Sequence, residues 1–98
     1  MPTYLVLGNF TEQGLHKVKD TIKRTEAYAA MAKKCGCTVK ESYWLLGQYD
    51  MLALVDAPND AAITSLQLSA GSLGNFRAQT HRAFSASEIE PILQKMAT

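Results

Sequence analysis

The stretch CTVKESYWLLGQYDMLALVDA, residues 37–57, decides the fold. Aromatic, aliphatic and β-branched residues fill both halves of this stretch, and Gly47-Gln48 separates the halves. A glycine at the first central position suits a two-residue type II′ turn. The sequence therefore predicts a β-hairpin with strands over residues 37–46 and 49–57.

Both faces of this hairpin are apolar near its middle. The predicted turn pairs Leu45 with Asp50 and Trp44 with Met51, and side chains alternate between the two faces from there. One face then holds Lys40, Ser42, Trp44, Leu46, Tyr49, Met51, Ala53 and Val55. The other face holds Val39, Glu41, Tyr43, Leu45, Asp50, Leu52, Leu54 and Asp56. A sheet with one face in water would be polar on that face, so we expect both faces to be covered.

The residues before the hairpin predict a strand and a long helical segment. TYLVLGNF, residues 3–10, is rich in β-formers and is typical of a first strand. Thr11 is an N-cap candidate, and Gly36 is a C-terminal stop. Gly14 and the Asp20-Thr21 pair leave room for a break into two helical pieces.

The residues after the hairpin predict a helix, a strand and a tail helix. Pro58-Asn59-Asp60 ends the third strand and caps a helix over residues 61–70, and the alternation in residues 74–84 predicts the fourth strand. The tail SASEIEPILQKM has two overlapping capping boxes, Ser85 to Glu88 and Ser87 to Glu90. Proline is best tolerated near a helix start, so Pro91 favours the second of these.

This order, β-α-β-β-α-β with a tail helix, predicts an α+β fold of the ferredoxin-like split βαβ type over one domain, residues 1–98. Its four-stranded antiparallel sheet would have both helices on one face. A chain this short has little surplus core, so we expect a second copy to cover the other face in a homodimeric barrel.

The amino-acid composition argues against several classes of protein. Ten Lys and Arg stand against nine Asp and Glu, which argues against a general nucleic-acid binder. No apolar run approaches the length of a membrane span, and MPTYLVLGNF lacks the pattern of a signal peptide, so a cytoplasmic protein is expected. Cys35 and Cys37 are interpreted as ordinary thiols, and no metal or other cofactor is expected.

Three stretches resemble the GYD domain family of the dimeric α/β-barrel group: PTYLVLGNFTEQG, GQYDMLALVDAP and GSLGNFRAQTHRAF. The Gly-Tyr-Asp signature occurs here in a spaced form, Gly47-Gln48-Tyr49-Asp50, with Gln48 where a basic residue is often found. The resemblance implies a dimer whose two sheets face each other. It implies no particular reaction, because related barrels include both enzymes and proteins without known chemistry.

Asp50 is the leading candidate site residue. It can accept backbone N–H groups at the hairpin end or pair with an arginine, and a structural role is the simpler interpretation. A carboxylate beside apolar residues could instead transfer protons, with Tyr49 and His81 as partners. The resemblance implies that the position of His81 is usually apolar, which speaks against a catalytic role that the family shares.

Aromatic residues and an arginine are the candidate ligand contacts. Tyr43, Trp44 and Tyr49 lie around the hairpin, where they are either core residues or the walls of a pocket. Arg82 in the fourth strand should find a carboxylate, Asp50 or Glu41, or a ligand anion.

Three hypotheses of function follow. The first is a binding protein that holds a small apolar or aromatic ligand between sheet and helices, with Tyr43, Trp44, Tyr49, Asp50 and Arg82 as its contacts. The second is a cofactor-independent monooxygenase or isomerase that uses Asp50, Tyr49 and His81. The third is a structural module whose apolar faces serve only oligomerisation.

Overall fold

The computed structural model describes all residues, 1–98, as a β-α-β-β-α-β unit with an additional C-terminal helix. The elements are β1 (Thr3–Phe10), α1 (Glu12–His16), the 3-10 helix η1 (Val18–Asp20), α2 (Thr21–Lys34), β2 (Thr38–Trp44), β3 (Met51–Asp56), α3 (Asp60–Gly71), β4 (Phe76–Ala83) and α4 (Ala86–Gln94). The four strands form one sheet in the order β2-β3-β1-β4. Every neighbouring pair is antiparallel, so the expected α+β fold with a four-stranded antiparallel sheet is confirmed.

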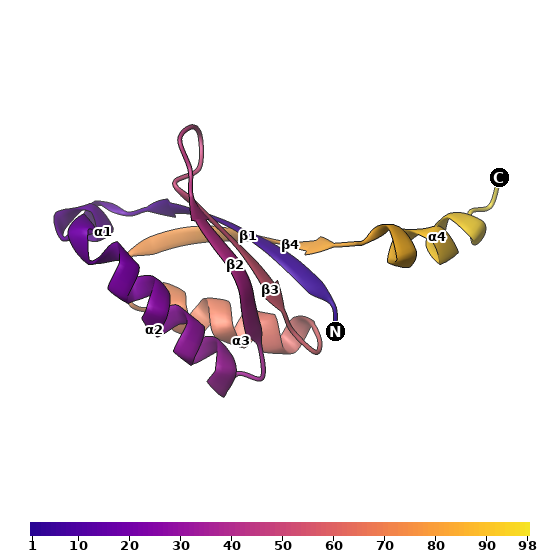
Figure 1. The fold of residues 1–98 in the computed structure, drawn as a ribbon, viewed down its shortest axis with the longest axis horizontal. Helices are drawn as coiled ribbons and strands as arrows, with labels where there is room; N and C mark the ends of the chain where they lie inside the picture. The colour runs from indigo at the N-terminus through magenta and orange to yellow at the C-terminus, as the bar shows by residue number, and fades with distance from the viewer.

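Helices α2 and α3 cover one face of the sheet, whereas α4 extends away from the body beyond the end of β4 (Figure 1). The molecule measures 51 × 31 × 19 Å, and its radius of gyration is 14.9 Å. A compact chain of this length would have a radius of gyration of about 12.6 Å. The projecting α4 accounts for the elongated shape. None of the helices combines the length and the apolar character needed to cross a membrane.

The hydrophobic core lies between the sheet and the two covering helices. Alternation along β1 points Tyr4 and Val6 toward the helices, where they are 4% and 5% exposed. The buried cluster consists of Tyr4, Val6, Ala32, Cys37, Val55, Ala57, Ile63 and Leu66. The Tyr4 hydroxyl donates to Asp60 Oδ1 at 2.5 Å, which ties the first strand to the start of α3.

The predicted break in the first helical segment is confirmed, because α1 ends at His16 and α2 begins at Thr21. Thr11 caps α1 by accepting the N–H of Gly14 on its side chain. A Cβ at Gly14 would lie 1.9 Å from the carbonyl oxygen of Asn75, so only glycine permits this close approach between α1 and the loop before β4. The helix resumes at Thr21 and stops before Gly36, whose φ of 78° favours glycine.

The hairpin turn differs from the prediction. The central pairs, Trp44 with Met51 and Tyr43 with Leu52, are confirmed, but the strands stop at Trp44 and restart at Met51. A two-residue type II′ turn is therefore wrong, and residues 45–50 form a longer loop. The backbone N–H of Asp50 donates to the carbonyl oxygen of Gly8 at 2.9 Å, so β1 holds the chain at this point.

A register shift near Lys40 also overturns part of the predicted face assignment. The strand pairing skips Lys40, so that Val39 lies opposite Val55 and Glu41 lies opposite Leu54. An extra residue in one strand moves the residues beyond it to the other face. Val39 consequently packs against the buried cluster, where the uninterrupted alternation had placed Lys40.

The tail helix uses the first capping box, which corrects the expectation that Ser87 begins it. Ser85 is the N-cap, and its side chain and that of Glu88 form the reciprocal capping bonds. Pro91 therefore lies inside α4, at a position that loses one helix hydrogen bond. The additional bond from Arg82 to Glu88, 2.9 Å long, stabilises this register.

The middle of the sheet face opposite the helices is apolar and has no cover within the chain, whereas the edge strands carry polar side chains such as Glu41, Gln79 and His81 on this face. Leu5 and Leu7 of β1 pair with Leu54 and Leu52 of β3, and all four are only partly buried. We call these four leucines the outer leucine cluster. Within a single chain, helices α2 and α3 cover the inner face of the sheet, as expected. That a second copy covers the outer face stays a prediction.

Candidate functional site

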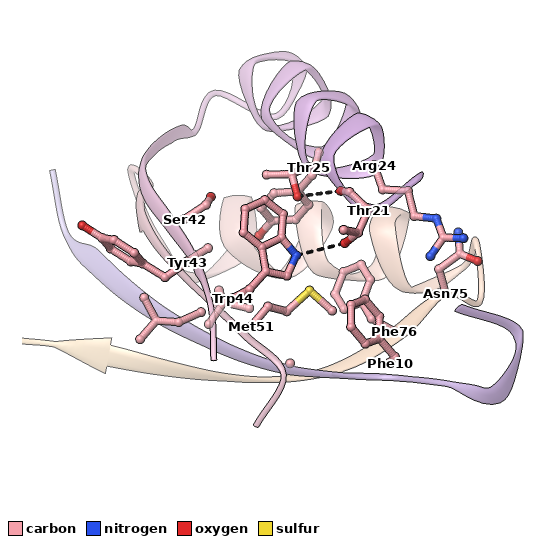
Figure 2. Close-up of a pocket in the computed structure, with 15 residues that line it drawn as sticks. Phe10, Thr21, Arg24, Thr25, Ser42, Tyr43, Trp44, Met51, Asn75 and Phe76 are labelled. Atoms are coloured by element: carbon pink, nitrogen blue, oxygen red, sulfur yellow. Dashed lines mark hydrogen bonds between the residues drawn. The ribbon is translucent and has the colours of Figure 1, made fainter. Parts of the chain in front are cut away.

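A pocket with a volume of about 70 Å³ opens between α2 and the sheet (Figure 2). Large apolar side chains from different parts of the sequence make most of its wall: Phe10, Tyr28, Trp44, Met51 and Phe76. Tyr28 and Phe76 meet edge to face, with ring centroids 6.3 Å apart. This pocket is the candidate functional site.

Gly8 leaves open the part of the pocket that lies on β1. A Cβ there would come within 3.4 Å of Met51 Cγ and 3.6 Å of Phe76 Cδ2, which is ordinary van der Waals contact. A larger side chain at this inward-facing position would occupy the space between these two residues. Because Gly8 has no side chain, this space remains part of the cavity.

Trp44 stands at the entrance of the pocket. Its indole Nε1 donates to Thr21 Oγ1 at 3.0 Å, across the gap between β2 and the first turn of α2 (Figure 2). The residue is 45% exposed, so one part of it contacts solvent while another part lines the pocket. Such an amphipathic side chain suits a pocket mouth.

Two polar side chains of the pocket, Arg24 and Tyr28, already have hydrogen-bond partners. The Arg24 guanidinium donates to the carbonyl oxygens of Gly14 at 2.8 Å and Lys17 at 2.9 Å. The Tyr28 hydroxyl donates to Gln67 Oε1 at 2.5 Å, and burial raises the pKa of Tyr28, which keeps it neutral. The pocket therefore presents apolar surface, and its one cation is occupied with backbone carbonyls.

Asp50 directly precedes the central strand β3, and its carboxylate binds the backbone of β1. Its Oδ2 accepts the N–H of Phe10 at 2.9 Å and a longer bond of 3.5 Å from the Asn9 amide. This is the geometry expected of the structural role. The predicted alternative of a pair with Arg82 is wrong, because Arg82 donates to Glu88 instead.

Tyr49, Tyr43 and His81 are associated with the outer face of the sheet. The Tyr49 hydroxyl donates to Gln79 Oε1 at 3.1 Å. Tyr43 is 53% exposed and donates to Glu41 Oε1, a bond that raises the pKa of its hydroxyl. His81 is exposed and lies opposite Leu5.

The structure does not connect the three candidate proton-transfer residues. Asp50 bonds the backbone at Gly8 and Phe10, whereas His81 pairs with Leu5 on the same strand. The three residues from Leu5 to Gly8 span roughly 10 Å of strand. No hydrogen bond joins His81 to either Asp50 or Tyr49.

Arg82 lies near the C-terminal end of β4. Its guanidinium stands 4.4 Å from the centroid of the Phe84 ring and 5.8 Å from that of Tyr4. It also bonds the carbonyl oxygen of Ala83 and the carboxylate of Glu88. Arg82 therefore anchors the start of α4 rather than lining the pocket.

Of the five predicted ligand contacts, Trp44 lines the pocket, and Tyr43 contributes at its margin with its ring directed outward (Figure 2). Sequence reasoning missed Phe10, Tyr28 and Phe76. The alternation of β1 places Phe10 on the same side as Val6, and the helical stripe of residues 15–32 passes next to Tyr28. Those periodicities could have suggested both residues, whereas their meeting with Phe76 depends on tertiary packing.

The two cysteines are free thiols. Cys37 is buried in the core, and burial raises the pKa of its thiol. No three side chains of His, Cys, Asp or Glu come together in a group that could hold a metal ion.

Comparison with known proteins identifies similar chains. A glutamine synthetase and cystathionine beta-lyase binding protein from Thermus thermophilus is 28% identical over 90 residues, which is 91% of this chain and 95% of that protein. The crystal structure of TTHA0845, also from Thermus thermophilus, is similar with a TM-score of 0.57 and 25% identity, over 88% of this chain and 96% of the other. An unknown protein from Galdieria sulphuraria shares the fold with a TM-score of 0.50 and 21% identity, over 87% of this chain and 46% of that one.

The family assignment rests on nearly the whole chain. The sequence pattern of the GYD domain matches residues 4–93, from Tyr4 in β1 to Leu93 in α4. This range includes all four strands of the sheet and every residue of the pocket described above. The chain therefore belongs to the GYD domain family.

Proposed function

We propose that this protein is a homodimeric binding protein that holds a small apolar or aromatic group in the pocket between α2 and the sheet. The observation that carries the proposal is the chemistry of the wall. Five large apolar side chains converge there, and Arg24 and Tyr28 already have hydrogen-bond partners. An uncharged apolar group is the ligand that such a wall accepts without leaving a polar group unpaired.

The volume of the pocket limits what can enter it. Pockets for drug-sized molecules measure roughly 300–1,000 Å³, whereas this one measures about 70 Å³. One ring or the end of an aliphatic chain is therefore the expected occupant. Burying about 150 Å² of apolar ring surface contributes about 4 kcal/mol, which by itself corresponds to a dissociation constant of about 1 mM. A tighter ligand would extend past Trp44 at the mouth.

The homodimer is proposed from the outer leucine cluster. Four leucines in the middle of an uncovered sheet make a contiguous apolar patch. Such patches on small proteins mark interaction surfaces. A second copy with the same leucines provides a self-complementary cover under twofold symmetry.

Geometry favours binding over the enzymatic alternative. A monooxygenase or isomerase using Asp50, Tyr49 and His81 needs these groups close to one bound molecule. Instead, Asp50 holds Phe10, Tyr49 bonds Gln79, and His81 lies further along the sheet. The third hypothesis, a module for oligomerisation alone, shares the proposed dimer but assigns no ligand to the pocket.

Fluorescence of Trp44 tests the ligand part of the proposal. Trp44 is the single tryptophan of the chain, so its emission reports on the pocket mouth without labelling. Titration with toluene should give a saturable change in emission. The matched control is Trp44→Phe with Tyr49→Trp, which moves the reporter to the outer face and should show no saturable response. An unresponsive Trp44 up to the solubility limit of toluene would refute the pocket.

A second candidate function is the binding of another protein. The Thermus thermophilus relative is named for binding two enzymes, glutamine synthetase and cystathionine beta-lyase. On this chain the loop between β2 and β3 projects from the body (Figure 1), and Leu46 at this loop is 106% exposed. A fully exposed leucine on a projecting loop is a suitable contact for a partner protein.

Calorimetric titration against the two purified enzymes tests this second function. Leu46→Ser should weaken any binding that the loop mediates, whereas Gln48→Ser in the same loop should leave it unchanged. Equal affinities of the two variants would remove the loop from the interface, and no heat of binding with either enzyme would reject these partners.

A further inference from the structure

Helix α4 makes almost no contact with the rest of its own chain. None of its residues is buried, and Ile92, Leu93 and the following Met96 are 45%, 55% and 59% exposed. Together with Ile89 they have the spacing i, i+3, i+4, i+7, which forms one apolar stripe along a helix. Ile92, Leu93 and Met96 face solvent, and Ile89 at the start of the stripe is half-buried.

A helix of this kind needs a partner surface. α4 spans nine residues and contains Pro91. Isolated helices shorter than about 12 residues are marginal in water, and an internal proline weakens them further. Its stability therefore depends on packing of the apolar stripe against another surface.

The start of α4 is nevertheless held firmly, so the helix has a defined direction. Arg82 bonds Glu88 at 2.9 Å and stacks on Phe84, while the capping box joins Ser85 to Glu88. The helix leaves at the level of the sheet rather than at the level of α2 and α3 (Figure 1). A molecule stacked on the outer face of the sheet would thus lie within reach of α4.

The area of the sheet explains why a dimer would need more than its outer face. Strands about 4.8 Å apart, with about seven residues of ~3.3 Å each, make a four-stranded face of roughly 19 by 23 Å, or about 440 Å². A stable interface buries about 800 Å² on each partner. The outer face alone falls short of this area, and the stripe on α4 is the additional apolar surface that this chain offers next to it.

We infer that α4 is an exchange arm: in the homodimer, each α4 packs its stripe of Ile89, Ile92, Leu93 and Met96 against the body of the second copy. This inference rests on the homodimer proposed above and adds the arm to its interface. Twofold symmetry makes the exchange reciprocal, so each body receives one arm and gives one.

Two substitutions of equal charge in the full chain test the arm. Leu93→Glu places a carboxylate on the stripe, and Gln94→Glu places one on the opposite side of α4. Neither position contacts the core, so both variants should keep the fold. Sedimentation equilibrium should show that Leu93→Glu raises the dimer dissociation constant about 100-fold, because a buried leucine is lost from both arms, whereas Gln94→Glu changes it less than about twofold.

Mixed isotope labelling locates the arm directly. In dimers of one ¹³C-methyl-labelled and one unlabelled copy, the methyl groups of Leu93 should show NOEs to protons of the other copy. A protein that sediments as a dimer but shows NOEs from Leu93 only within its own chain, or none, overturns the arm and leaves the homodimer intact. A monomeric wild-type protein overturns both proposals.

Discussion

Asp50 is bonded to Phe10: its Oδ2 accepts the Phe10 backbone N–H at 2.9 Å. The same aspartate donates its own N–H to Gly8, so one residue of the hairpin loop satisfies two backbone groups of β1. The ring of Phe10 forms part of the pocket wall. The carboxylate therefore acts on the pocket through the backbone position of Phe10.

Asp50→Ala should lower the free energy of unfolding by about 1–3 kcal/mol, because the N–H of Phe10 loses its acceptor. Asp50→Asn keeps an acceptor oxygen and should cost less. Chemical denaturation measures both values. A proton-transfer role would instead show itself as an Asp50→Asn variant of unchanged stability in which turnover of a candidate substrate is abolished.

Gly14→Ala should destabilise the protein by about 3 kcal/mol, since overpacking a tight contact has costs of this order. The new Cβ would lie 1.9 Å from the carbonyl oxygen of Asn75, so α1 and the loop before β4 would have to separate. Gly71→Ala is the matched control because a Cβ there meets nothing within 4 Å. If thermal unfolding shows the same shift for both variants, the close contact at Gly14 does not matter.

Gly8→Ala should weaken ligand binding in the pocket without lowering the stability of the protein. The added methyl group makes ordinary contacts with Met51 and Phe76, and alanine is about 0.5–1 kcal/mol more favourable than glycine within a strand. The same methyl group takes space from the pocket. We expect an unchanged or higher melting temperature together with weaker toluene binding, read from Trp44 emission. Undiminished binding in the folded variant would place the ligand elsewhere.

Low pH should weaken the hydrogen bonds that Glu88 makes at the start of α4. The Ser85 backbone N–H and then the Arg82 guanidinium lower the pKa of Glu88 to about 2. A carboxylate with a lowered pKa stabilises the folded state above its ordinary pKa of about 4.3, and this contribution is lost as the pH falls toward 2.

NMR can follow this loss through the amide signal of Ser85, whose proton is donated to Glu88. The signal should shift with a midpoint near the Glu88 pKa of about 2 in the wild type and stay flat in Glu88→Gln. A midpoint at the ordinary pKa of glutamate would contradict the proposed anchoring of α4.

Local patterns were sufficient to predict the order of the elements. The strand alternation, the Thr11 cap and the Gly36 stop depend on neighbours in sequence. The errors occurred where distant contacts decide the structure. β1 bonds the chain at Asp50, next to the loop that replaces the tight turn, and Arg82 bonds Glu88 of the capping box that α4 uses.

The pocket was harder to predict because its wall combines elements far apart in sequence. Trp44, which the sequence left as either a core residue or a pocket wall, lines the pocket, and its contact with a ligand stays a prediction. Phe10, Tyr28 and Phe76 come from β1, α2 and β4, and only the packing of helix on sheet brings them together. Alternation assigns each residue to a face, but it does not specify which rings meet.

Native mass spectrometry of the protein purified without added ligand tests the central claim most directly. We predict a species of twice the 10.7 kDa chain mass that carries a reproducible additional mass from a small apolar molecule. A bare monomer of 10.7 kDa at micromolar concentration would contradict both the homodimer and the bound ligand.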